Sequence, residues 1–129
     1  MAWIKALAAA IPVITEIKMI ESGSALLPFT GGAQTTASGI RVYRNSGNSY
    51  EAKFSIDLTD MNTLTCNFIN RSGSGYAVMA VDGTNVGSSN SSSGTMTGSV
   101  ASYTGTHEVK LYCSEINAEF TATDYIATA

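Results

Sequence analysis

The sequence is poor in charged residues, and this scarcity excludes several classes of protein. Asp, Glu, Lys and Arg make up 13% of the 129 residues, about half the usual share of a globular domain. The seven Lys and Arg residues form no cluster and the net charge is −3. Nucleic acids and anionic membrane surfaces bind clustered cations, so neither is expected as a partner. No apolar run approaches the roughly 20 residues that a membrane-spanning helix needs, so membrane insertion is not expected either.

Histidine is equally scarce, because His107 is the only one. No metalloprotease, serine-hydrolase or phosphate-loop motif occurs. His107 opens a predicted strand after a turn, which indicates a structural or hydrogen-bonding role. Glycoside hydrolysis needs two carboxylates held roughly 5–10 Å apart in a cleft, and carboxylates are few. We therefore predict no catalytic residues and no enzymatic activity, and we keep a small glycan-active enzyme as the last alternative.

The few carboxylates lie near predicted turns. Asp57, Asp60, Asp82 and Asp124 all occupy strand ends or turns, where Asp commonly accepts backbone hydrogen bonds. No calcium-loop motif is present, so we assign no metal ligands and no cofactor. A structural calcium ion held by turn carboxylates and backbone carbonyls is left open.

Cysteine is scarce too. Cys66 and Cys113 are too few for a disulfide framework, and they do not form a C-x-x-C motif. Each lies on the apolar face of a predicted strand. Two buried free thiols are therefore the favoured interpretation, and one inter-strand disulfide is the alternative.

What the chain does have begins with one helical segment. Residues 2–10 have the highest helix propensity in the sequence, and Pro12 ends the segment. The apolar stretch is short and contains its basic residue, which is not typical of a signal peptide, so secretion by that route is not expected. A helix this short is marginal alone. We expect residues 1–12 to be an arm that docks on a larger assembly through Trp3, Ile4 and Leu7.

From residue 13 onward, apolar and polar residues alternate with the period of a β-strand. The clearest case is 50–58, where alternate residues from Tyr50 to Leu58 are predicted to face inward. The remaining strands are predicted at 13–20, 39–44, 63–70, 76–82, 95–100, 106–113 and 116–127. In the strand at 76–82, Val78 and Ala80 are expected to face inward. The Ser- and Gly-rich segment 83–94 is expected to be a mobile loop. About eight short strands without intervening helices predict an all-β, antiparallel two-sheet sandwich over residues 13–129.

The order of five segments resembles that of carbohydrate-binding-module-like jelly rolls. These segments are Tyr50–Thr59 (YEAKFSIDLT), Leu64–Phe68 (LTCNF), Val81–Gly83 (VDG), Tyr103–Tyr112 (YTGTHEVKLY) and the closing strand to Ile126. The resemblance covers about two-thirds of the chain and implies a jelly-roll β-sandwich. Similar domains occur as modules of glycan-degrading enzymes and in bacteriophage tail, baseplate and head-decoration proteins. One such fold hosts many functions, so the resemblance bears more on fold than on role.

Aromatic residues are the candidates for ligand binding. Sugar recognition combines a flat ring with hydrogen-bonding side chains around it. Arg41 and Tyr43 share the polar face of one predicted strand, Tyr112 lies on the polar face of another, and Tyr103 lies in a turn. We take these four residues as candidate glycan-binding residues, with half-buried structural tyrosines as the alternative.

The favoured interpretation is a non-enzymatic structural or adhesion protein of a phage or phage-like virion, assembled in the bacterial cytoplasm. Its partners would be other virion proteins and copies of itself, with cell-surface carbohydrate as a further ligand. The arm would dock on the particle and the sandwich would be exposed, where many copies provide avidity. The alternative is a free carbohydrate-binding module of a bacterial glycan-utilisation system.

Overall fold

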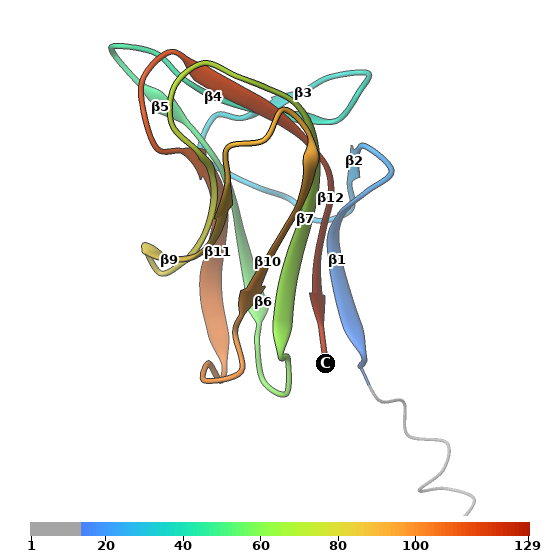
Figure 1. The fold of residues 1–129 in the computed structure, drawn as a ribbon. Helices are drawn as coiled ribbons and strands as arrows, with labels where there is room; N and C mark the ends of the chain where they lie inside the picture. The colour runs from blue at the N-terminus through green and yellow to red at the C-terminus, as the bar shows by residue number, and fades with distance from the viewer. Residues whose placement is uncertain (1–13) are drawn as a thin grey trace, which may run out of the picture.

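The computed structural model describes residues 14–129, and these residues form two antiparallel β-sheets packed face to face (Figure 1). Within this range no helix forms, so these residues contain no membrane-spanning helix. The predicted arm at 1–12, with Trp3, Ile4 and Leu7, lies outside the described residues. The strands are β1 (Glu16–Glu21), β2 (Ser24–Ala25), β3 (Gln34–Thr35), β4 (Ile40–Arg44), β5 (Ser49–Tyr50), β6 (Ala52–Asp57), β7 (Thr63–Ser72), β8 (Ala77–Val81), β9 (Thr84–Ser89), β10 (Gly94–Ser99), β11 (Thr106–Cys113) and β12 (Ala118–Thr128).

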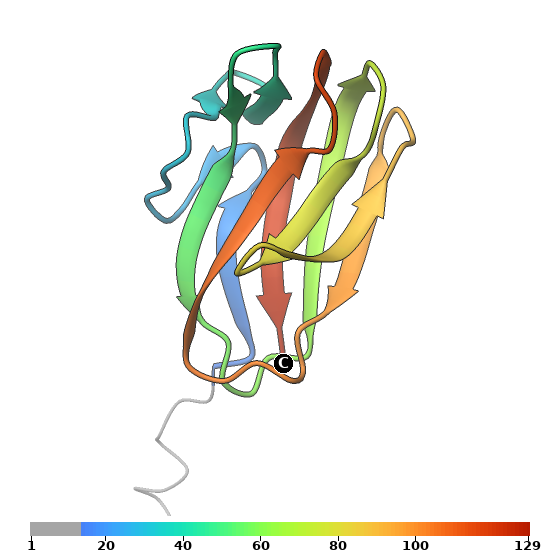
Figure 2. The same ribbon diagram turned by 90° about the vertical axis from the view of Figure 1, so that its left-hand side faces the viewer.

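The larger sheet is built around the last strand of the chain. Its order is β10-β7-β12-β1-β2, and β3, β4 and β5 join it through pairing of β4 with β12. The first half of β12 pairs with β4 and β7, and its second half pairs with β1 and β7. The smaller sheet has the order β6-β11-β8-β9 and lies in front of the larger one in Figure 2. The predicted all-β sandwich is thus confirmed.

One apolar core fills the space between the sheets. Phe54, Ile56, Leu64, Val109 and Leu111, which the period-two pattern placed inside, all belong to a single buried cluster. Aromatic rings pack edge to face across it. The ring centres of Phe54 and Tyr125 are 6.0 Å apart, as are those of Phe68 and Phe120. Cys66 and Cys113 are buried there as free thiols.

The strand predicted at 50–58 is divided between the two sheets. Tyr50 pairs in β5 with β4 of the larger sheet, whereas β6 belongs to the smaller sheet. The chain passes from one sheet to the other at Glu51, whose N–H donates a hydrogen bond to the carbonyl of Gly31 at 2.7 Å. A Cβ on residue 31 would lie 2.5 Å from the Glu51 carbonyl oxygen, so this approach requires glycine. The expectation that Tyr50 faces the core was wrong, because its half-buried ring lies on the surface of the larger sheet.

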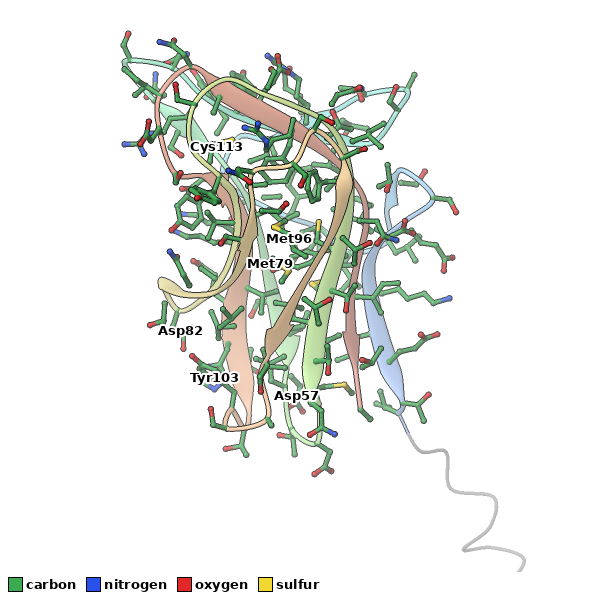
Figure 3. The ribbon with its side chains drawn as sticks, viewed as in Figure 1. Asp57, Met79, Asp82, Met96, Tyr103 and Cys113 are labelled. Atoms are coloured by element: carbon green, nitrogen blue, oxygen red, sulfur yellow. The ribbon has the colours of Figure 1, made fainter. Side chains whose placement is uncertain are left out.

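Two further expectations were wrong. The core side chains of β8 are Ala77, Met79 and Val81, and not Val78 and Ala80 (Figure 3 labels Met79). The segment predicted as a mobile loop contains β9, which pairs with β8.

The two ends of the sandwich differ in what they carry. β1 and β12 are antiparallel, so Glu16 lies beside Thr128, and the C-terminus lies at the lower end in Figure 1. The opposite end carries the β4–β5, β7–β8 and β11–β12 turns. Side chains at that end are therefore far from the C-terminus.

Candidate functional site

A hollow of about 400 Å³ lies at the end of the sandwich away from the C-terminus, and we call it the arginine hollow. It is formed by β4, the start of β12 and the turn residues beside them. The lining residues are Arg41, Tyr43, Arg44, Asn45, Asn117, Ala118 and Glu119. Small-molecule sites commonly enclose about 300–1,000 Å³, so the hollow is large enough to hold a sugar residue.

The pairing of β4 with β12 brings the charged groups of the hollow together. Tyr43 lies opposite Glu119 in this register. The Arg41 Nε donates to Glu119 Oε2 at 2.7 Å, and a second guanidinium N–H of Arg41 donates to Gln34 Oε1 at 3.0 Å. The hollow therefore presents a fixed guanidinium and a fixed carboxylate side by side.

Tyr43 is a wall of the hollow and not a stacking platform. The Arg41 guanidinium carbon lies 4.0 Å from the centre of its ring, and the Tyr50 ring is stacked on it at 4.3 Å. Two groups at these distances cannot share one face of a ring, so they cover opposite faces. Tyr43 can offer a ligand only its edge and hydroxyl. Arg41 and Tyr43 were correctly predicted to share a face, but the predicted mode of contact, a sugar packed on the ring, is not open to Tyr43.

Turn geometry places the two asparagines of the hollow. Asn45 Oδ1 accepts hydrogen bonds from the N–H groups of Gly47 (3.0 Å) and Asn48 (2.8 Å), which closes the β4–β5 hairpin. Asn117 has a φ of 61°, a left-handed conformation that asparagine tolerates. Its N–H donates to the Arg44 carbonyl at 2.7 Å, which joins the β11–β12 turn to β4.

A smaller hollow of about 140 Å³ adjoins the arginine hollow across Arg44 and Asn45, and we call it the hairpin hollow. Ile116 lines it and is 46% exposed. Tyr76 lies in the β7–β8 turn at the same end of the molecule and is 47% exposed. Its carbonyl accepts a hydrogen bond from the N–H of Ser114. Sequence reasoning missed Tyr76 as a candidate because it was treated as the first residue of a strand. Its position directly after the Gly75 turn was the available signal.

Tyr112 lies apart from the arginine hollow, on the outer face of the smaller sheet. It alternates with the buried Leu111 and Cys113, so its ring points away from the core. Its hydroxyl donates to Asn85 Oδ1 at 2.5 Å, and the Lys110 ammonium lies 4.8 Å from its ring centre. These contacts hold the ring down on the sheet.

Tyr103 lies near the opposite end of the molecule, close to Asp57 in Figure 3. Its ring packs against the core and meets His107 edge to face at 5.2 Å. His107 Nδ1 lies 2.5 Å from Asp82 Oδ2, and His107 Nε2 lies 2.8 Å from the Thr104 carbonyl. The hydrogen bond to Asp82, followed by the one to Thr104, raises the pKa of His107. The structure thus separates Tyr103 and Tyr112 from Arg41 and Tyr43.

A third hollow, of about 300 Å³, lies beside the outer edge of β6, with Phe29, Lys53 and Glu108 in its lining. Phe54 also borders this hollow but is only 1% exposed, and its ring centre lies 5.6 Å from that of Phe29. Phe29 is itself half-buried, so only part of one ring is accessible to a ligand there. This hollow is therefore a weaker candidate than the arginine hollow.

The residues that the structure describes do not bring three His, Cys, Asp or Glu side chains together as metal ligands. Three of the four carboxylates that the sequence placed near turns accept hydrogen bonds within the fold. Asp57 accepts from the N–H of Thr59, and Asp82 accepts from the N–H of Glu108. Asp124 accepts from the N–H of Ser22 and from the side chain of Asn67. A calcium site built on clustered acids is therefore not formed by these residues. A calcium ion held by one turn carboxylate and backbone carbonyls stays a prediction.

The fold is similar to that of solved carbohydrate-binding modules. One is a carbohydrate-binding module CBM36 in complex with calcium and xylotriose, with a TM-score of 0.58 and 17% identity over 90% of this chain and 100% of that chain. Another is the CBM36-1 domain of a multidomain xylanase from the hindgut metagenome of Trinervitermes trinervoides, with a TM-score of 0.54 and 15% identity over 89% and 95% of the two chains. The sequence matches no protein-family model and is similar to no curated protein.

These likenesses confirm the predicted resemblance at the level of the fold. Neither structure is described as part of a virion. The favoured interpretation as a virion protein therefore gains no support, and the fold is the one that the alternative interpretation, a carbohydrate-binding module, requires.

Proposed function

We propose that this chain is a non-catalytic carbohydrate-binding domain, and that it binds sugar in the arginine hollow. The observation that carries the proposal is the joint placement of Arg41, Tyr43, Asn117 and Glu119 in one hollow, at the end of a sandwich with the fold of carbohydrate-binding modules. Sugar hydroxyls both donate and accept hydrogen bonds. The guanidinium donates, the carboxylate accepts and the amide does both, so the lining complements such a ligand.

The same lining supports a binding role over hydrolysis. Glycosidases use two carboxylates on either side of the scissile bond. Of the described residues that line the arginine hollow, Glu119 is the one carboxylate, and it is paired with Arg41. The proposed mechanism is therefore hydrogen bonding to a ligand at a pre-formed surface. Because the hollow is open and polar, water competes for the same groups, and we expect modest affinity for a single chain.

Arg41→Met tests the proposal. Methionine keeps an unbranched stem beside Tyr43 but removes the N–H donors and leaves Glu119 without its partner. The matched control is Lys18→Met on β1, which also removes a cation that is paired with acids, in this case Glu16 and Glu21. Isothermal titration with xylotriose and a glycan array carrying plant and bacterial polysaccharides are the assays, with the protein attached through its C-terminus.

We expect Arg41→Met to weaken glycan binding at least about tenfold, since a hydrogen bond to a charged group contributes roughly 1.5–3 kcal/mol. Lys18→Met should bind as the unchanged protein does. Equal unfolding temperatures would show that both variants are folded. Full binding by folded Arg41→Met would refute the arginine hollow as the site, and absence of binding to every glycan would refute the carbohydrate-binding function.

A further inference from the structure

All three arginines of the sequence, Arg41, Arg44 and Arg71, gather at the end of the molecule that holds the arginine hollow. All three lie close enough to Cys113, at the end of β11, for their charges to act on its thiol. Burial raises the pKa of this thiol to about 12, and Glu119 adds to the rise, whereas all three arginines oppose it. A chain with a net charge of −3 therefore concentrates guanidinium groups at one end.

The three guanidinium groups differ in how fully they are bonded. Arg41 is paired with Glu119 at 2.7 Å. Arg71 donates to the carbonyls of Ser91, Gly73 and Gly75, at 2.8, 3.1 and 3.1 Å. Both side chains thus make several contacts inside the protein, although Arg41 keeps N–H groups that its bonds to Glu119 and Gln34 do not use.

Arg44 is the exception. It donates one hydrogen bond, from a terminal guanidinium nitrogen to the Ser114 carbonyl at 3.0 Å. Within residues 14–129, no carboxylate lies within ion-pair distance of it. A guanidinium group has five N–H donors, so most of those of Arg44 remain available. Glu115, the acidic residue of the β11–β12 turn, is exposed and has its side chain beside Gly75.

The sheet fixes the backbone of Arg44, and the hydrogen bond to Ser114 anchors its guanidinium group before any ligand arrives. Arg44 is paired with Ser49 on one side and with Ala118 on the other, and its carbonyl accepts the N–H of Asn117. Its half-buried side chain lines both the arginine hollow and the hairpin hollow. A fixed donor loses little conformational entropy when it binds, which favours affinity.

We propose that the arginine hollow selects glycans that carry a carboxylate, namely those that contain uronic acids, and that Arg44 binds the carboxylate. The planar guanidinium matches a carboxylate with two parallel hydrogen bonds. Glu119 does not oppose such a ligand strongly, because Arg41 neutralises it. This inference rests on the proposed carbohydrate-binding function and adds the chemical class of the ligand.

The test compares acidic glycans with the same glycans after reduction of their carboxyl groups. The probes are glucuronoxylan, polygalacturonate and alginate, each beside its carboxyl-reduced form, in affinity electrophoresis and in titrations at low and high salt. The variants are Arg44→Gln and, as the matched control, Lys18→Gln, which removes one positive charge from a half-buried residue of β1. Both variants are checked for an unchanged unfolding temperature.

We expect at least one acidic glycan to bind about 10- to 100-fold more tightly than its reduced form, in line with one charge-assisted contact. Salt should weaken this preference. Arg44→Gln should abolish it and Lys18→Gln should keep it. Equal binding of acidic and reduced forms would overturn the selectivity but leave the carbohydrate-binding function intact. A preference that survives in Arg44→Gln would overturn the role of Arg44. Absence of binding to all six probes would overturn the selectivity for acidic glycans, and absence of binding on the glycan array as well would overturn the carbohydrate-binding function.

Discussion

Replacing Gly98 by alanine tests how the sandwich is closed along its β9–β10 side. These strands are the outer strands of the two different sheets. They meet so closely at Gly98 that a Cβ added there would lie 2.4 Å from the carbonyl oxygen of Val86 and 3.1 Å from its Cβ. Gly98 is not one of the positive-φ glycines, so alanine is acceptable to its backbone conformation. The substitution therefore tests the packing between the sheets alone.

The expected loss of stability follows from two opposing effects. An extra methyl group in a tightly packed position costs about 1–3 kcal/mol, because the backbones must move apart. Alanine also restricts the unfolded chain more than glycine does, which returns about 0.4–1 kcal/mol. Because the clash is with the backbone, at 2.4 Å, the cost lies in the upper part of its range, about 2–3 kcal/mol, so the net loss is about 1–2 kcal/mol. For a domain of this size each kcal/mol lowers the unfolding temperature by about 4 °C. Gly98→Ala should thus unfold about 4–8 °C below the unchanged protein.

Gly47→Ala is the matched control. Gly47 also lacks a positive φ, and a Cβ there would meet only Asn45 Oδ1, at 3.7 Å. Its unfolding temperature should stay within about 1 °C of the unchanged protein or rise slightly. Differential scanning calorimetry of the three proteins provides the comparison. If Gly98→Ala is as stable as Gly47→Ala, β9 is not packed on β10, and residues 83–94 form the mobile loop that their composition predicts.

Two further outcomes follow from the titratable groups. The pKa of His107 is raised above 6.5 and that of Asp82 is lowered below 3.8, each chiefly by their mutual hydrogen bond. The pair should therefore stabilise the fold fully between pH 3.8 and 6.5, and lose this contribution as pH rises through the raised pKa of His107. Thermal unfolding from pH 5 to 9 should show a decline that His107→Gln flattens, and identical profiles would contradict this. Because the described residues do not bring three acidic side chains together, excess EDTA should leave the unfolding temperature unchanged. A drop that calcium reverses would show that the chain holds a structural calcium ion through other oxygen ligands.

The parts of the fold that the sequence predicts well are those where polar and apolar residues alternate strictly. In β11, Val109, Leu111 and Cys113 are buried while the residues between them are more exposed, as period two requires. The same holds for Leu64, Cys66 and Phe68 in β7. Such strands have one face on the core and one in water, so the pattern determines which side chains enter the core.

Strands without this contrast were predicted less well. All five residues of β8 are buried, so hydrophobicity carries no period and the register was wrong by one residue. The composition of β9 is that of a loop, TNVGSS, and its strand conformation depends on pairing with β8 and on the close packing of Gly98 against Val86. Tertiary contacts outweighed local preference in both strands.

The candidate site could be predicted in part for a similar reason. Arg41 and Tyr43 lie two residues apart in one strand, so their shared face could be read from the sequence. Glu119, which completes the group, is 78 positions away from Arg41 and reaches it through the pairing of β4 with β12. No local pattern encodes that pairing. Tyr103 and Tyr112 resemble Tyr43 in local sequence context but lie in other parts of the fold.

Sequence identity with the structural neighbours is low, at 15–17%, although they share the fold. Alternation of apolar residues is enough to build the two sheets, and many sequences satisfy it. The arginine hollow is formed by outward-facing residues of β4 and β12 and by turns, and the core places no demand on their chemistry. The ligand proposed for this chain is therefore argued from these positions and not from the ligands of its neighbours. Arg44, with its available donors, makes a carboxylate the group that this hollow is best suited to bind.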